Sequence, residues 1–106
     1  METAEKIRAL NDTARHTFQG CRIMLTLGVQ QLECLPKVLN AVRCFSSFDE
    51  SNDPHGEHDF GSLRMNDQTI FWKFDYYDVD LQMASPDPAD LTVTVRVLTI
   101  MLADEY

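Results

Sequence analysis

Along Thr69–Tyr77, every second residue carries a large apolar or aromatic side chain. A period of two is that of a β-strand, in which successive side chains point to opposite faces. One face consists of Ile70, Trp72, Phe74 and Tyr76, and we expect it in the core. The other consists of Phe71, Lys73, Asp75 and Tyr77, which suits a half-exposed surface or the floor of a cleft. The segment therefore predicts a sheet with one buried face.

Two other segments show the spacing of an amphipathic helix. Apolar residues three and four apart predict a helix from Thr3 to Phe18, on which Arg15 is available to face water. A second helix is expected to begin near Pro36, because the N–H that proline lacks is not needed in a first helical turn. Its apolar stripe consists of Leu35, Val38, Leu39, Val42 and Phe45.

Strands are also predicted over Arg22–Val29, Ser62–Met65 and Val79–Met83, the last with alternating apolar residues. The segment 91–103 is ambiguous. Its three valines alternate as in a strand, but a strand would place three later apolar residues on the polar face, so we favour a helix. An aspartate of the preceding turn, Ser85–Asp90, is expected to cap that helix.

Together these segments predict an α+β fold in a single domain, residues 1–106. The predicted order is α-β-α-β-β-β-α, with three helices against one face of a mainly antiparallel sheet of about four strands. Residues 46–61 are nearly all polar, which predicts a long acidic loop between the second helix and the strands that follow.

Charge is unevenly divided along the chain, whose formal net charge is −8. The residues up to Ser47 include six basic and four acidic side chains, whereas those from Phe48 onward include three basic and thirteen acidic ones. An acidic half of this kind repels nucleic-acid phosphates and anionic lipids, so we expect no direct binding to nucleic acid or membrane. It attracts a basic protein surface or a metal cation instead.

Several classes of protein find no support in the sequence. The apolar runs are much shorter than the roughly 20 residues that a membrane span requires, and no secretory signal is present, so we expect a cytoplasmic protein. Three cysteines, Cys21, Cys34 and Cys44, are expected to be reduced. No G-x-S-x-G, P-loop or G-x-G-x-x-G motif occurs. The oligomeric state stays open between monomer and homodimer.

Four sequence motifs follow one another along the chain, namely Asp53–Gly61, Phe71–Asp78, Ser85–Asp90 and Arg96–Tyr106. Through them the chain, from Ile7 onward, resembles a bacterial family catalogued as domain of unknown function 3768. The resemblance implies a free-standing bacterial protein of a kind often encoded on plasmids or other mobile elements. It implies no activity, cofactor or catalytic residue.

The segment Asp53–Asp59 gathers two imidazoles and three carboxylates around Gly56. These groups are ligands that zinc, manganese and iron use, so one alternative function is a small metal-dependent hydrolase. Its divalent metal would be bound by His55, His58, Asp59 and Asp75, and its catalytic residues would be Glu57 and Asp75. The spacing matches no established metal motif. A loop whose side chains hydrogen-bond its own backbone accounts for the same residues.

The favoured hypothesis is a noncatalytic interaction protein that needs no cofactor. Its acidic half would dock on a basic surface of a host protein, such as a nucleic-acid-handling or defence complex, and inhibit it. The binding surface would consist of Asp49, Glu50, Asp53, Glu57, Asp59, Asp75, Asp78 and Asp80. Solubility alone is the competing explanation of the charge.

Overall fold

The helices lie on one side of a four-stranded sheet in the computed structural model, which describes residues 2–106. The helices and strands are α1 (Thr3–Thr17), β1 (Arg22–Leu25), α2 (Leu27–Gln30), α3 (Leu35–Arg43), β2 (Phe60–Met65), β3 (Gln68–Tyr77) and β4 (Val95–Leu102). Two 3-10 turns flank β4, and they are η1 (Leu91–Val93) and η2 (Ala103–Glu105). No helix among residues 2–106 has the length and apolar character needed to cross a membrane.

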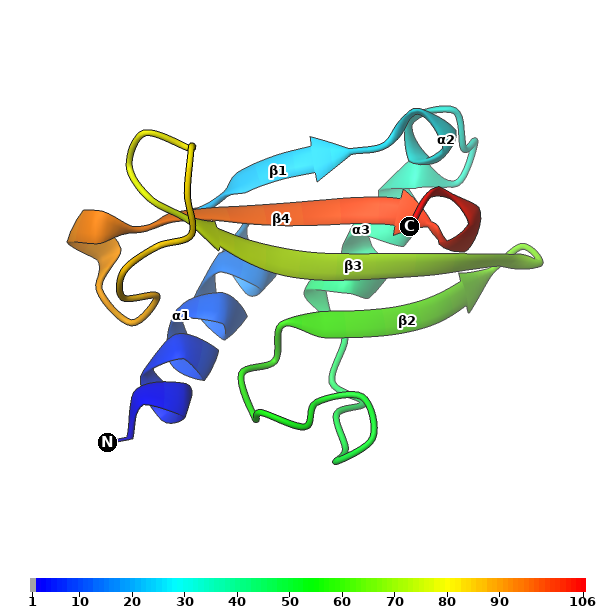
Figure 1. The fold of residues 1–106 in the computed structure, drawn as a ribbon. Coiled ribbons are helices and arrows are strands. Elements are labelled where there is room, and N and C mark those ends of the chain that lie inside the picture. The colour runs from blue at the N-terminus through cyan, green and yellow to red at the C-terminus, as the bar shows by residue number, and fades with distance from the viewer. Residues whose placement is uncertain (1) are drawn as a thin grey trace.

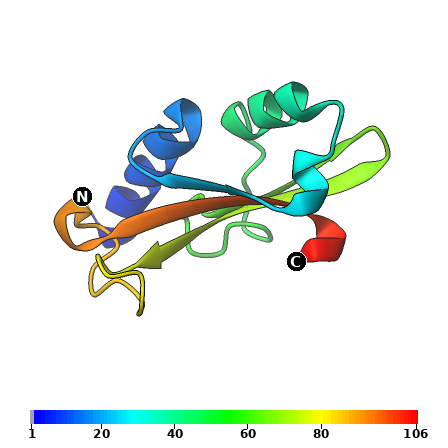
Figure 2. The same ribbon diagram turned by 90° about the horizontal axis from the view of Figure 1, so that it is seen from above.

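The sheet has the strand order β1-β4-β3-β2, so the last strand of the chain lies inside it (Figure 1). β4 pairs in parallel with β1 and antiparallel with β3, and β2 pairs antiparallel with β3. Seen from above, α1 and α3 cover one face, whereas η2 and the loop that follows β3 lie on the opposite side (Figure 2). The predicted α+β class is confirmed, with a mixed sheet.

The hairpin β2–β3 confirms the two predicted faces of the aromatic strand. Ile70 and Trp72 are fully buried, whereas Phe71 and Lys73 on the other face are only partly covered. Asn66 and Asp67 form a two-residue turn in which both φ angles are positive, 52° and 65°. Such a turn matches the twist of the strands that it joins, so it sets the register that pairs Met65 with Gln68.

The core lies between the sheet and the helices. Its fully or nearly fully buried members are Ala14, Val29, Val38, Val42, Ile70, Trp72, Phe74, Leu98 and Ile100. The ring of Phe45, just after α3, lies 5.4 Å from that of Trp72 at an interplanar angle of 77°. Edge-to-face contacts of this kind fix the position of the indole ring.

Arg15 does not face water as the sequence analysis allowed, because only 1% of it is exposed. Its Nη1 lies 2.8 Å from the carbonyl oxygens of Val42 and Phe45, at the end of α3. Its guanidinium group also lies 4.9 Å from the ring centre of Trp72. Arg15 therefore donates to carbonyl groups at and just after the end of α3, where the helix itself supplies few donors, and it joins α1 to α3.

Two predicted strands are shortened or absent. β1 ends at Leu25, and the remainder of the predicted strand Arg22–Val29 turns into α2, whose Val29 is fully buried. The segment Val79–Met83 forms a loop and not a strand. The observed order of helices and strands is α-β-α-α-β-β-β.

The predicted final helix over 91–103 is wrong, because this segment forms one 3-10 turn and then β4. Leu98, on the helix side of β4, is fully buried. On the other side, Val97 is 9% and Met101 is 2% exposed, because neighbouring side chains cover them too. A strand buried on both faces is apolar at consecutive positions, so it lacks the alternation that marks a half-exposed strand. Asp90 caps η1 through the N–H of Thr92.

Candidate interaction surface

The acidic loop, residues 46–59 in the structure, is fastened to α1 by His58. Its Nδ1 lies 2.8 Å from an oxygen of Asp12, and its Nε2 lies 3.6 Å from an oxygen of Asp53. The imidazole stacks on the ring of Phe48, with centres 3.8 Å apart and planes 3° from parallel. Both ring nitrogens of His58 thus face carboxylates that hold the loop.

A buried polar network fastens the same loop to the sheet. Asn11, fully buried on α1, donates to the hydroxyl of Tyr76 (2.8 Å) and to the carbonyl oxygen of Glu57 (3.0 Å). The Tyr76 hydroxyl donates to the Glu57 carboxylate (3.0 Å), and Arg96 Nε donates to the Asn11 amide oxygen (2.8 Å). Burial raises the pKa of Tyr76 above the ordinary tyrosine range and lowers the pKa of Arg96. Glu57 is therefore part of the architecture of the loop.

The residues predicted as metal ligands are only partly brought together. His55, Asp59 and Asp75 line one hollow on the surface, whereas His58 points to Asp12 and Asp53. Burial is the main cause that raises the pKa of Asp59. Within residues 2–106, no group of three or more histidine, cysteine, aspartate and glutamate side chains has an arrangement that could hold a metal ion.

The eight carboxylates predicted as a binding surface differ in what they contact, and one of them, Asp59, lines the hollow described above. Asp49 and Asp78 accept hydrogen bonds from backbone N–H groups of their own loops. The hydroxyl of Ser51 also donates to Asp49, and this bond, followed by the backbone ones, lowers the pKa of Asp49. Asp53, Glu57 and Asp75 have the partners His58, Tyr76 and Lys73. Glu50 and Asp80 are exposed to solvent. The carboxylates thus contribute negative charge to the surface, and most of them also hold a loop or a side chain in place.

The face of the sheet that the helices leave uncovered is closed at one end by aromatic rings. Tyr106 lies 5.8 Å from Phe71 and 6.4 Å from Phe60, measured between ring centres. Glu105, just before it, accepts hydrogen bonds from Thr26 Oγ1 (2.6 Å) and from the N–H of Gly28 (2.9 Å), and these bonds lower its pKa. They fasten η2 against the end of β1, so this part of the face is covered.

The middle of the uncovered face carries an ion pair. Lys73 Nζ lies 3.0 Å from an oxygen of Asp75, two positions further along β3. The hydrogen bond to Asp75 raises the pKa of Lys73. Both side chains are about one third exposed, so the pair contributes little to stability. It does neutralise the one basic residue on the uncovered face of β3.

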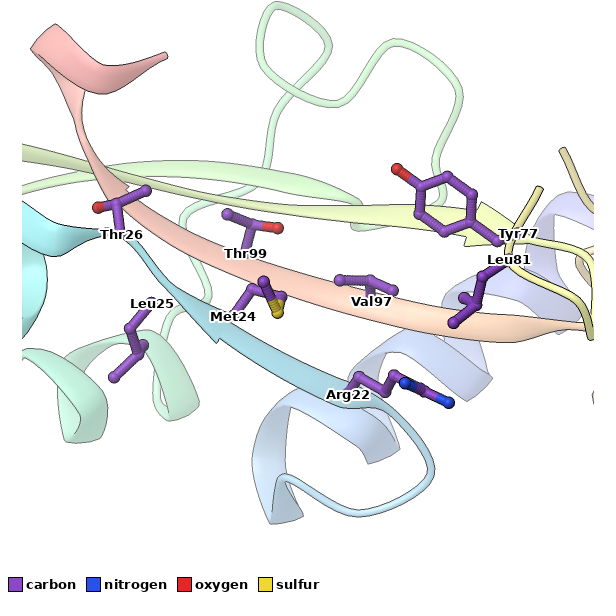
Figure 3. Close-up of a pocket in the computed structure, with 8 residues that line it drawn as sticks. All are labelled: Arg22, Met24, Leu25, Thr26, Tyr77, Leu81, Val97 and Thr99. Atoms are coloured by element: carbon purple, nitrogen blue, oxygen red, sulfur yellow. The ribbon is translucent and has the colours of Figure 1, made fainter. Parts of the chain in front are cut away.

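The other end of the uncovered face holds a pocket of about 400 Å³, which we name the sheet pocket (Figure 3). Its apolar wall comes from Met24 of β1, Val97 of β4, Tyr77 of β3 and Leu81 of the following loop. Figure 3 shows Met24, Val97 and Tyr77 on one face of the sheet, with Leu81 beside Tyr77. Thr26, Thr99 and Arg22 add polar groups, and Leu25 completes the lining.

The loop after β3, residues 78–84, borders the sheet pocket, and we name it the apolar loop. Asp78 organises it, because its N–H donates to the carbonyl oxygen of Met83 (2.8 Å) and its carboxylate accepts from the N–H of Gln82 (3.0 Å). Val79 and Met83, two of the alternating apolar residues of the strand predicted here, are 61% and 71% exposed. Leu81 has a φ of 59°.

Sequence reasoning missed the sheet pocket, although one signal pointed to it. The outward position of Tyr77 was predicted from the alternation along β3, and an exposed aromatic ring marks a contact surface more often than a polar residue does. The contributions of Met24 and Val97 had no such signal, because they depend on the parallel pairing of β1 with β4.

Comparison with known proteins gives one match. The family model described as "Protein of unknown function (DUF3768)" matches residues 21–105. Neither the curated proteins nor the solved structures that were searched yield a match.

Proposed function

The chain belongs to the DUF3768 family, whose description assigns no activity, and we propose that it is a noncatalytic acidic protein that binds a basic surface of another protein. In this proposal it is encoded by a bacterial mobile element and acts in the cytoplasm. Its partner is a host protein that handles nucleic acid, or a defence complex, and binding blocks the cationic surface that the nucleic acid would occupy.

The observation that carries the proposal is the lack of available positive charge in the half that begins at Phe48. It contains thirteen acidic side chains and the basic residues Arg64, Lys73 and Arg96. Arg96 is only 2% exposed, and Lys73 is paired with Asp75. Arg64 is left as the one exposed basic residue among these three. This half therefore presents a strongly negative surface, which speeds association with a cationic one.

The test must neutralise carboxylates that do not hold the fold together. Asp53 and Glu57 are unsuitable, because they bind His58 and Tyr76. Exposed carboxylates of the acidic half suit it better, and the test variant combines Glu50→Gln, Asp80→Asn and Asp104→Asn. The matched control combines Glu2→Gln, Glu5→Gln and Glu33→Gln, which removes the same number of exposed charges from the other half.

The wild-type protein and both triple variants are immobilised and used to capture proteins from a bacterial lysate at low salt. Each captured protein is purified, and its binding to the variants and to nucleic acid is measured. We expect a basic partner that loses its nucleic acid when the wild-type protein is added. Its affinity for the test variant should fall about tenfold below that for the control variant, with a shallower dependence on salt. Equal affinities for the two variants would show that the negative surface is not the contact.

A further inference from the structure

We propose that the sheet pocket and the apolar loop bind one large apolar side chain of the partner, from a segment whose neighbouring residues are basic. This inference rests on the proposed function and locates the centre of the contact. A cluster of carboxylates supplies attraction but little selectivity, whereas a buried apolar anchor contributes most of the affinity in many protein interfaces.

Several exposed apolar side chains lie together at this end of the uncovered face. Val79 and Met83 of the apolar loop are 61% and 71% exposed, and Met24, on the strand across the pocket, is 55% exposed. At the opposite end of the same face, Tyr106 packs on Phe60 and Phe71. Tyr106 is itself 75% exposed, so it covers Phe60 and Phe71 with a single ring, whereas several apolar side chains are exposed together around the sheet pocket.

The conformation of the apolar loop brings Leu81 to the wall of the pocket at an energetic cost. A left-handed backbone with φ of 59° costs an ordinary L-residue about 1–2 kcal/mol, and glycine or asparagine would adopt it more easily. The hydrogen bonds of Asp78 hold this conformation. A strained position that carries an exposed apolar side chain is typical of a binding site, where the strain presents the side chain in a fixed place.

The size of the pocket limits what can enter it. Its volume of about 400 Å³ lies near the lower end of the range for ligand pockets, about 300–1,000 Å³. One aromatic or long aliphatic side chain with its adjoining backbone fits such a volume. The hydroxyl groups of Thr99 and Tyr77 lie at the wall and can bond that backbone.

Negatively charged residues near the pocket favour basic residues next to the apolar side chain of the partner segment. Asp78 and Asp80 flank the exposed residues of the apolar loop, so lysine or arginine residues of the partner segment would lie on that side. Arg22, which borders the pocket from β1, is the one basic residue in the lining. The same carboxylates disfavour an anionic lipid surface and a second copy of this chain, whose net charge is also −8.

The experiment uses the full chain with isotope-labelled methyl groups and two synthetic peptides as probes. Both peptides carry the same run of lysine and arginine residues, followed in one by tryptophan and in the other by serine. We expect the tryptophan peptide to shift the methyl signals of Met24, Leu81 and Val97 and to bind about five to ten times more tightly than the serine peptide.

A pair of variants separates the pocket from exposed apolar surface in general. Leu81→Asn removes the apolar side chain and suits the left-handed backbone, so the variant should fold at least as well as the wild type. Leu91→Asn is the matched control, because Leu91 is 58% exposed and does not line the pocket. The preference for the tryptophan peptide should disappear in Leu81→Asn and persist in Leu91→Asn.

Three outcomes would overturn the inference. Equal, salt-dependent binding of both peptides would mean that charge alone acts, which leaves the proposed function intact. Methyl shifts that appear on concentrating the protein without any peptide would identify the occupant as a second copy. Failure of both peptides to bind would reject the pocket, and the capture experiment with the triple variants then decides separately on the negative surface.

Discussion

Tyr76 joins three parts of the molecule through one hydroxyl group, which accepts from Asn11 on α1 and donates to Glu57 in the acidic loop. Tyr76→Phe leaves the packing of the ring in place and removes both hydrogen bonds. We expect the free energy of unfolding to fall by about 1–2 kcal/mol at neutral pH. Urea unfolding measures it, with Tyr106→Phe, at a residue that is 75% exposed, as the control.

The same substitution has a defined pH dependence. Burial raises the pKa of Tyr76 in the folded state, so the unfolded chain loses this proton first, near the ordinary value of about 10. Between the two pKa values the unfolded state binds fewer protons, and the stability of the wild type falls as pH rises. The advantage of the wild type over Tyr76→Phe should therefore be constant below about pH 9 and shrink above about pH 10. An advantage that grows in alkali would show that the hydroxyl ionises more easily when folded.

At the scale of the elements, Gly61 of β2 lies opposite Trp72 of β3. A methyl group at Gly61 would overlap Nε1 of the indole and lie 2.5 Å from its Cε2. The ring cannot retreat, because it is fully buried and has edge-on contacts with Phe45, Phe48 and Phe74.

Gly61→Ala should therefore cost about 1–3 kcal/mol of the free energy of unfolding, the range for overpacked cores. Trp72 is the only tryptophan, so its fluorescence reports both the unfolding transition and any change around the ring. Ser62→Ala, at an exposed position of the same strand, serves as the control. If both variants are as stable as the wild type, Gly61 and Trp72 are not paired in this register.

The elements also show how far the sequence could predict this structure. β3 was predictable because only one of its faces is buried, so alternation along Ile70–Tyr76 reports the fold directly. β4 was not predictable, because it is buried on both faces: Leu98 on the side of the helices, and Val97 and Met101 on the opposite side. The resulting continuous apolar run resembles a buried helix. Val79–Met83 alternates like a strand, although its apolar residues are exposed at the surface.

Some parts of the candidate site could be predicted from the sequence, and others could not. The acidic loop was recognisable from composition, since no hydrophobic burial could shape it into a helix or strand. The partner of His58 was not recognisable from the sequence. Asp12 belongs to a helix far away along the chain, and only the fold brings it next to His58. The sheet pocket likewise requires Arg22 and Val97 to lie side by side, which no local pattern encodes.

At the scale of the whole molecule, the net charge of −8 is confined to a body that measures 38 × 30 × 23 Å. Electrostatic interactions reach about 30 Å at 0.01 M salt and about 8 Å at 0.15 M, so nearly all carboxylates repel one another in dilute buffer. The melting temperature should therefore rise by several degrees between about 0.01 M and 0.3 M sodium chloride.

Thermal unfolding followed by circular dichroism measures this effect. The variant that combines Glu50→Gln, Asp80→Asn and Asp104→Asn should show a smaller rise, because less repulsion remains to be screened. A melting temperature that falls with salt would mean that ion pairs such as Lys73–Asp75 outweigh the repulsion.

The position of β4 in the sheet has a consequence for how the protein is made. The ribosome synthesises α1, β1, β2 and β3 before it reaches β4, and yet β4 is the strand that joins β1 to β3. Until Val97 emerges to pair with Arg22, β1 has no hydrogen-bonding neighbour and the apolar faces of the helices have only part of a sheet to cover. Such late, long-range pairing slows folding and leaves the nascent chain open to aggregation.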